Sequence, residues 1–316
     1  MYKYPLPSYL QGVRTQAEYN YWVSSKAEHL RDNDIAVKRP FDTMPTHEEY
    51  DQEVNRAAVV CNGIDPFTGE KLRFDLIDSY DDRRAKGDIA YDKQFDLMPV
   101  ADHIDPVARV LSLEITAKRT NACKSGQTPE EFLAMCRTIA AHGWIRSQGQ
   151  GGGQSLPWVL RIPILKNLPI YFPPDFAKEK CTGHQFRKWL ASHGRTLFYK
   201  DVKLKRPYAL NSSRSTYIHL VNEAAQRGQF DPCTGEELAW EKIDTWNSHL
   251  ASNNLEYFKK FRLLPTVDHI DPGADVLEFE ICSWKINLCK GNLNPQEFVD
   301  LCKRVVEYAE KNGLSS

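Results

Sequence analysis

The sequence predicts an α+β fold made of two homologous, mostly helical modules, and three observations support this prediction. The chain repeats itself, each repeat carries capped helical segments, and each carries two short apolar segments with strand-like alternation. Its 316 residues are enough for about two domains of roughly 100–200 residues. A composition with 41% hydrophobic and 26% charged residues is that of a globular protein, so a disordered, collagen-like or coiled-coil chain is excluded.

The duplication is visible as a direct self-alignment. Residues 65–136 align without a gap to residues 231–302 at an offset of 166, with about 31 identities in 72 positions. Upstream the offset becomes 167 and pairs Trp22 with Trp189. We therefore expect a first module at 1–146 and a second at 157–316. The Gly, Gln and Ser composition of residues 147–156 is typical of a flexible linker.

Two helices are expected at the start of each module. Each begins near a Ser or Thr that can cap it, and the predicted ranges are 15–31, 46–61, 182–192 and 215–227. A Thr-Gly pair then predicts a sharp turn or short hairpin at 67–72 and at 233–238.

A strand, a turn, a second strand and a helix are expected next. The predicted strands are 97–104 and 110–115 in the first module, and 263–270 and 276–281 in the second. The following segments, which carry Asn121 and Asn287, are expected to be helical. A last helix in each module begins with a capping box, Thr128-Pro129-Glu130-Glu131 or Asn294-Pro295-Gln296-Glu297, and ends at Gly143 or Gly313.

The cellular setting is predicted from what the sequence lacks. No run of 18 apolar residues occurs and the N-terminal residues do not resemble a signal peptide, so we expect a cytoplasmic protein without membrane contact. The eight cysteines include no C-x-x-C pair, so we expect reduced, mostly buried thiols and no structural zinc.

Basic residues gather in one part of a chain whose net charge is −1. Residues 156–206 hold eleven Lys and Arg against three Asp and Glu, with Trp189, Phe198 and Tyr199 among them. Such a segment is suited to follow a polyanion backbone, and a solvated helix face is the equally weighted alternative. The nucleic-acid interpretation predicts contacts from Lys203, Lys205 and Arg206.

Four polar residue types recur in register within the strand–turn–strand–helix segments. Asp102-His103-Ile104-Asp105-Pro106 repeats as residues 268–272, and Asn121-Ala122-Cys123-Lys124 repeats as residues 287–290. This pattern resembles the HNH nuclease family, whose ββα-metal finger carries Asp-His-x-x-Pro followed by Asn-x-x-Lys. The resemblance covers about 25 residues in each repeat. Asp105 and Asp271 are expected to form turns rather than to bind a ligand.

The resemblance implies a site that hydrolyses phosphodiester bonds. Histidine titrates near neutral pH, so His103 and His269 resemble the general bases that deprotonate water. The implied ligands of a divalent metal, Mg²⁺ or alternatively Mn²⁺, are oxygen donors: Asp102 and Asn121 in the first repeat, Asp268 and Asn287 in the second. The implied phosphate contacts are Lys124 and Lys290.

The two repeats depart from the family pattern at a middle position. There the family usually has an Asn that orients the base, and this chain has Ser112 and Glu278. Either Glu114 and Glu280 take over this role, or the base is held differently. The tail Lys290-Gly291-Asn292 of the second repeat is closer to the family than residues 124–126, which favours the second site if a single site is active.

Two functions of different class follow from these observations. The first is a metal-dependent DNA endonuclease with two HNH-like sites that makes double-strand breaks, of restriction, homing or anti-phage type. The second is a nucleic-acid-binding or assembly module that keeps the fold with one or both sites inactive. RNA as the substrate and control by a protein partner are alternatives that the sequence leaves open.

Overall fold

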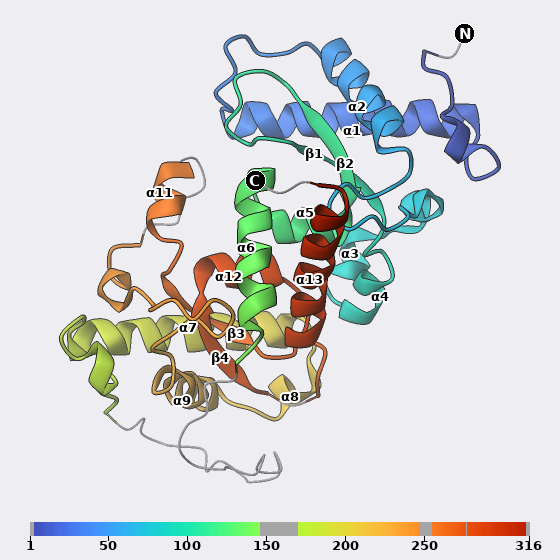
Figure 1. Cartoon of the computed structure of the whole chain (residues 1–316). Helices are drawn as coiled ribbons and strands as arrows, with labels where there is room; N and C mark the ends of the chain where they lie inside the picture. Colours follow the sequence, from blue (N-terminus) through green and yellow to red (C-terminus); the bar gives the residue numbers. More distant parts are fainter. Residues whose placement is uncertain (1–2, 146–169, 247–254, 276, 314–316) are drawn as a thin grey trace. The chain divides into compact units, whose positions relative to one another are not determined.

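The computed structural model describes residues 3–145, 170–246, 255–275 and 277–313 (Figure 1). The chain divides into two compact units, which are described separately below. The first comprises residues 1–85, 90–137 and 301–316, and the second comprises residues 86–89 and 138–300. Each unit combines helices with one two-stranded antiparallel sheet, so the predicted α+β class is confirmed. The predicted linker, residues 147–156, lies outside the described residues.

Two long helices open the first unit. They are α1 (Gln16–Ala36) and α2 (His47–Cys61), and capping boxes at Thr15 and Thr46 begin them as the sequence predicts. The first helix continues five residues beyond its predicted end. The two helices and the sheet enclose a core that includes Trp22 and Tyr50. Short helical turns occur at η1 (Ser8–Leu10), η2 (Phe74–Ser79), α3 (Asp82–Ala85) and α4 (Ile89–Lys93).

The sheet of the first unit is a hairpin followed directly by a helix. Strand β1 (Pro99–His103) pairs with β2 (Leu113–Ala117), and α5 (Lys118–Lys124) comes next. The first strand lies within its predicted range, whereas the second begins three residues later than predicted. The Asp105 side chain accepts from the Val107 amide, which confirms its turn-forming role.

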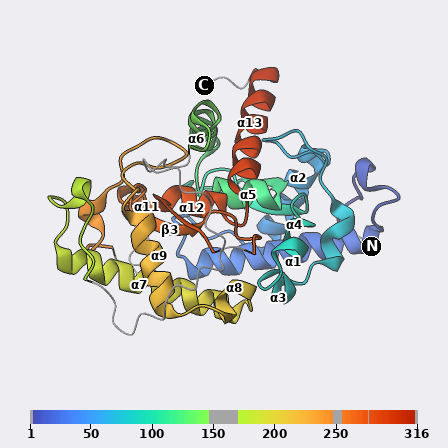
Figure 2. The same cartoon turned by 90° about the horizontal axis from the view of Figure 1, so that it is seen from below.

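The second unit also contains two long helices and, later in the chain, a hairpin followed by a helix, with short elements between them (Figure 2). Strand β3 (Pro265–His269) pairs with β4 (Phe279–Ser283), and α12 (Trp284–Lys290) follows. Helices α7 (Gly183–Lys203) and α9 (Arg214–Ala225) pack side by side, and α9 packs against β4. The smaller elements are η3 (Asp175–Ala177), α8 (Pro207–Leu210), η4 (Trp240–Lys242) and α11 (Leu255–Lys260). Asp271 accepts from the Gly273 amide and forms the predicted turn.

The predicted ends of both long helices in the second unit were wrong. Helix α7 runs eleven residues past Ser192, through Gly194. A Cβ atom at Gly194 would lie 2.9 Å from the Ile218 backbone, so this glycine permits close packing of α7 on α9 instead of ending the helix. Helix α9 is capped by Ser213, two residues before the predicted start, and ends at Ala225.

The last helix of each repeat contributes to both units. Helix α6 (Pro129–His142) and helix α13 (Pro295–Lys311) begin with the predicted capping boxes. Residues from 301 onward belong to the first unit, where Arg304 pairs with Glu70 at 2.8 Å. Residues from 138 onward belong to the second unit, where the Ile145 amide donates to the Pro232 carbonyl. The compact units therefore differ from the sequence repeats at these C-terminal segments.

All eight cysteines are free thiols, and all but the half-buried Cys61 are buried, as predicted. Within the described residues, no helix has the length and apolar character needed to cross a bilayer.

Candidate functional site

The predicted general base of the first unit lies at the end of β1 and is buried. His103 is 5% exposed, and its Nε2 atom lies 2.9 Å from Oδ2 of Asp34. Asp34 is fully buried in the last turns of α1. The same carboxylate oxygen accepts from the Tyr50 hydroxyl at 2.6 Å, and Oδ1 accepts from Arg39 Nε at 2.6 Å. One carboxylate thus binds three side chains from different parts of the first unit.

Electrostatics keep the Asp34 carboxylate ionised. Burial by itself would raise its pKa, but hydrogen bonds from His103, Tyr50 and Arg39 hold the pKa below its usual value. Burial and the hydrogen bond to Asp34 raise the pKa of the Tyr50 hydroxyl, so that hydroxyl remains a donor. An ionised carboxylate can only accept, so the histidine donates from Nε2.

The second unit brings the same four residue types together, although its arginine reaches the aspartate as an ion pair and not as a hydrogen bond. His269 is 4% exposed, and its Nε2 atom lies 2.8 Å from Oδ2 of the fully buried Asp201. The Tyr217 hydroxyl donates to that oxygen at 2.8 Å, and Arg206 forms an ion pair with Asp201 at 3.2 Å. Burial lowers the pKa of His269 despite the opposing effect of Asp201, which favours the neutral imidazole. We call each set of four residues the His–Asp network.

Aromatic rings also contact both histidines. The Phe41 ring lies 6.4 Å from the His103 ring, and the Tyr208 ring lies 6.2 Å from the His269 ring, measured between centroids. Phe41 and Tyr208 follow the Lys-Arg-Pro segments that connect the first two long helices of each repeat. These segments cover the imidazoles and contribute to their burial.

The two predicted phosphate-binding lysines are buried and paired with the predicted metal ligands. Lys124 is 1% exposed, and its Nζ atom lies 2.8 Å from Asp102 Oδ2 and 2.6 Å from the His103 carbonyl. Lys290 is also 1% exposed, and its Nζ atom lies 2.8 Å from Asp268 Oδ2 and 3.1 Å from the His269 carbonyl oxygen. Each ammonium therefore joins the end of the first strand of the hairpin to the helix that follows the hairpin.

The predicted metal ligands lie close to these lysines and are partly exposed. The side chains of Asp102 and Asp268 are 23% and 14% exposed. Asn121 and Asn287 are half-buried on α5 and α12. Nδ2 of Asn287 donates to the Val267 carbonyl at 3.3 Å, which leaves its Oδ1 atom as the acceptor of that amide. Carboxylate and amide oxygen donors are thus held on one hairpin-and-helix unit.

The positions that depart from the family pattern have defined contacts. The carbonyls of Ser112 and Glu278 accept from the amides that follow the two histidines and so close the hairpins. Glu114 lies opposite Asp102 in the sheet register, and burial raises its pKa to about 7. Glu280, opposite Asp268, accepts from the Trp144 indole at 2.9 Å. The contact that holds each imidazole comes from Asp34 or Asp201, residues that the sequence prediction did not select.

The predicted DNA-contacting residues have different environments. Lys203 and Lys205 are exposed at the end of α7 and just after it. Arg206 is 9% exposed, because its guanidinium is directed at Asp201 and the Tyr208 hydroxyl. The first part of the basic segment, residues 156–169, lies outside the described residues.

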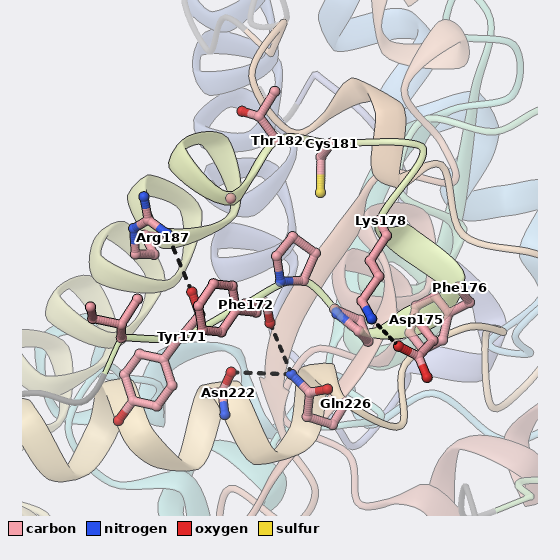
Figure 3. A pocket seen from close by; sticks show the side chains of 14 residues that line it. Tyr171, Phe172, Asp175, Phe176, Lys178, Cys181, Thr182, Arg187, Asn222 and Gln226 are labelled. Atoms are coloured by element: carbon pink, nitrogen blue, oxygen red, sulfur yellow. Dashed lines mark hydrogen bonds and ion pairs between the residues drawn. The ribbon is translucent and has the colours of Figure 1, made fainter.

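A surface pocket of about 940 Å³ lies elsewhere in the second unit (Figure 3). Gln226, the residue that follows α9, donates to the Phe172 carbonyl, and Lys178 pairs with Asp175. None of the predicted site residues lines this pocket. In the described parts of the chain, no three or more His, Cys, Asp or Glu side chains form a group suited to a metal ion.

Comparisons of the chain with protein-family models, with curated proteins and with solved structures found no match.

Proposed function

We propose that this chain is a metal-dependent DNA endonuclease with one HNH-like active site in each unit. The observation that supports this proposal best is the recurrence of one arrangement: a hairpin whose first strand ends in Asp-His, followed by a helix that carries Asn and Lys. A hairpin followed by a short helix agrees with the ββα-metal finger that the sequence resemblance implies. Two sites in one chain are suited to cutting both strands of a duplex.

In this proposal His103 and His269 are the general bases, and each accepts the proton of the attacking water at Nδ1. The Nε2–H group of each ring donates to a buried carboxylate, so Nδ1 carries the lone pair. The burial that lowers the pKa of His269 supports this role, because a base must be neutral before it accepts a proton.

The donor atoms fit a hard divalent cation such as Mg²⁺, with Mn²⁺ as the alternative. Asp102 with Asn121, and Asp268 with Asn287, offer oxygen ligands, and solvent reaches both carboxylates. Such a small protein donor set suits an ion that keeps most of its water. When bound, the ion would stabilise the negative charge that develops on the phosphate and the leaving oxygen. The paired lysines place an amino group beside each carboxylate.

The assay that tests this proposal uses supercoiled plasmid with Mg²⁺, with Mn²⁺ or with chelator. Wild type is expected to give linear DNA, His103→Ala and His269→Ala each to give nicked circles, and the double variant to leave the plasmid intact. Cutting by the double variant at the wild-type rate would refute the assignment of both bases.

A nucleic-acid-binding or assembly module is the second candidate, and a specific observation favours it. Both imidazoles are about 5% exposed and both Asp–Lys pairs are closed, which is the arrangement expected of hairpins kept as scaffold. For this candidate, histidine substitution leaves DNA affinity intact and no variant, wild type included, cuts any DNA offered.

A further inference from the structure

We propose that Asp34 and Asp201 are positioning residues that fix the tautomer and orientation of His103 and His269. This inference deepens the proposed nuclease function and rests on it for its catalytic meaning. The two aspartates come from α1 and α7, far in sequence from the hairpins that carry the histidines. The structural part of the inference, the tautomer, can be measured without any cleavage assay.

The contacts leave little freedom to either ring. Asp201 is fully buried, and His269 Nε2 lies 2.8 Å from its Oδ2 atom. Tyr217 donates to the same oxygen, and Arg206 balances the charge of the carboxylate. Because this carboxylate is an acceptor only, it selects the imidazole tautomer with its proton on Nε2. The other nitrogen, Nδ1, is thereby kept in the acceptor form that a general base needs.

The duplication strengthens the inference beyond a single contact. The aspartate and the histidine are 69 residues apart in the first repeat and 68 residues apart in the second. The segment between these two residues is therefore one residue shorter in the second repeat. The contact is present in both, together with its Arg and Tyr partners. A buried ion pair of this kind often adds no more stability than apolar residues of similar size, so its presence in both repeats favours a role besides stability.

The aspartate contact also accounts for the position at which both repeats depart from the family pattern. The family's middle Asn, which orients the base, is replaced by Ser112 and Glu278, whose carbonyls close the hairpins. A carboxylate from the first long helix of each repeat supplies the orienting contact instead. The aspartate takes the place of the missing Asn as the group that holds the ring.

The experiment measures the tautomer and the kinetics on the full chain. In protein with ¹⁵N-labelled histidine, wild-type His269 is expected to carry its proton on Nε2. Asp201→Asn is expected to shift the ring toward the Nδ1–H form, because the amide can donate. In a His103→Ala background, the same variant should lower kcat by about 10² or more with KM nearly unchanged. Asp201→Glu, which keeps the charge, should retain the Nε2–H tautomer and recover part of kcat.

Tyr217→Phe is the matched control, because it removes another hydrogen bond to the same oxygen and leaves the carboxylate in place. It is expected to lower the melting temperature and to keep the Nε2–H tautomer. An unchanged His269 tautomer in Asp201→Asn would overturn the inference. If the Asn variant does not fold, Asp201→Glu is the deciding variant. Loss of the Nε2–H tautomer in Asp201→Glu would also overturn the inference. If no form of the protein cuts DNA, the nuclease proposal fails while the tautomer measurement still tests the positioning contact.

Discussion

The Lys290 ammonium lies 2.8 Å from the Asp268 carboxylate, and only 1% of the lysine is exposed. The predicted metal ligand of the second unit therefore already has a cationic partner from α12. Lys124 and Asp102 have the same relationship in the first unit. Any divalent ion that binds either carboxylate shares that carboxylate with a lysine ammonium, so the lysine weakens metal binding. In the absence of metal, the same lysine balances the charge of the carboxylate.

Lys290→Met is expected to destabilise the protein by about 2–4 kcal/mol without metal, because Asp268 loses its buried partner. Millimolar Mg²⁺ should then raise the melting temperature of this variant more than that of wild type, since a ligand bound only to the folded state stabilises it. Lys200→Met, at an exposed position on α7, serves as the control and should behave like wild type. An equal response of Lys290→Met and wild type to Mg²⁺ would argue against Asp268 as a metal ligand.

The basic residues near the end of α7 are expected to separate into two groups. Lys203→Gln combined with Lys205→Gln should weaken DNA binding without sequence preference, because both side chains are exposed. The slope of log K against log salt should become less negative by about 2. The free energy of unfolding should change by about 0.5 kcal/mol or less. Arg206→Gln should instead cost about 2–4 kcal/mol, because it removes the cation beside buried Asp201. Thermal melts and binding titrations at two salt concentrations measure both effects. Unchanged affinity in the double Lys variant would remove this segment from the DNA interface.

Gly194→Ala is expected to destabilise the second unit by about 1–3 kcal/mol. An alanine in a helix is normally the more stable residue, but here its Cβ would lie 2.9 Å from the Ile218 backbone, and α7 and α9 would have to separate. Gly183→Ala, at the first position of the same helix, meets only the flexible end of Arg187 and should be neutral or slightly stabilising. Urea unfolding of both variants tests the sign, and a stabilised Gly194→Ala would contradict the packing argument.

The capped helices and the hairpins could be predicted from sequence because their signals are local. Thr15, Thr46 and Thr128 begin their helices as expected, and both Asp-His pairs end the first strand of a hairpin. The ends of α1 and α7 could not be predicted, because a polar last turn and an internal glycine resemble the end of a helix.

The same limit explains why the His–Asp networks were not predicted. Asp34 and Asp201 lie in the helical turns beyond the predicted ends, where an acidic residue on a polar segment resembles a solvated surface group. Their partners are 69 and 68 residues away, so the contact exists only in the folded unit. One signal was available: Asp34 and Asp201 correspond at the offset of 167 that also aligns Lys38-Arg39-Pro40 with residues 205–207.

Asp96 gives the first unit a stability that depends on pH. Burial raises its pKa from the ordinary 3.8 to about 6, although Arg119 and Lys118 oppose the shift. Because the folded-state pKa is the higher one, the favourable contribution of the protonated carboxyl is complete below pH 3.8 and is lost as the pH rises through 6. Asp96→Asn keeps a neutral side chain at every pH, so it should stabilise the protein at pH 7 by about 1–2 kcal/mol and make no difference near pH 3.5. Denaturant unfolding of both proteins across this range measures the difference, and Asp32→Asn, at an exposed position of α1, controls for the loss of one acidic charge. A variant that is less stable than wild type at pH 7 would show that the pairing of Asp96 with the neighbouring cations outweighs its burial.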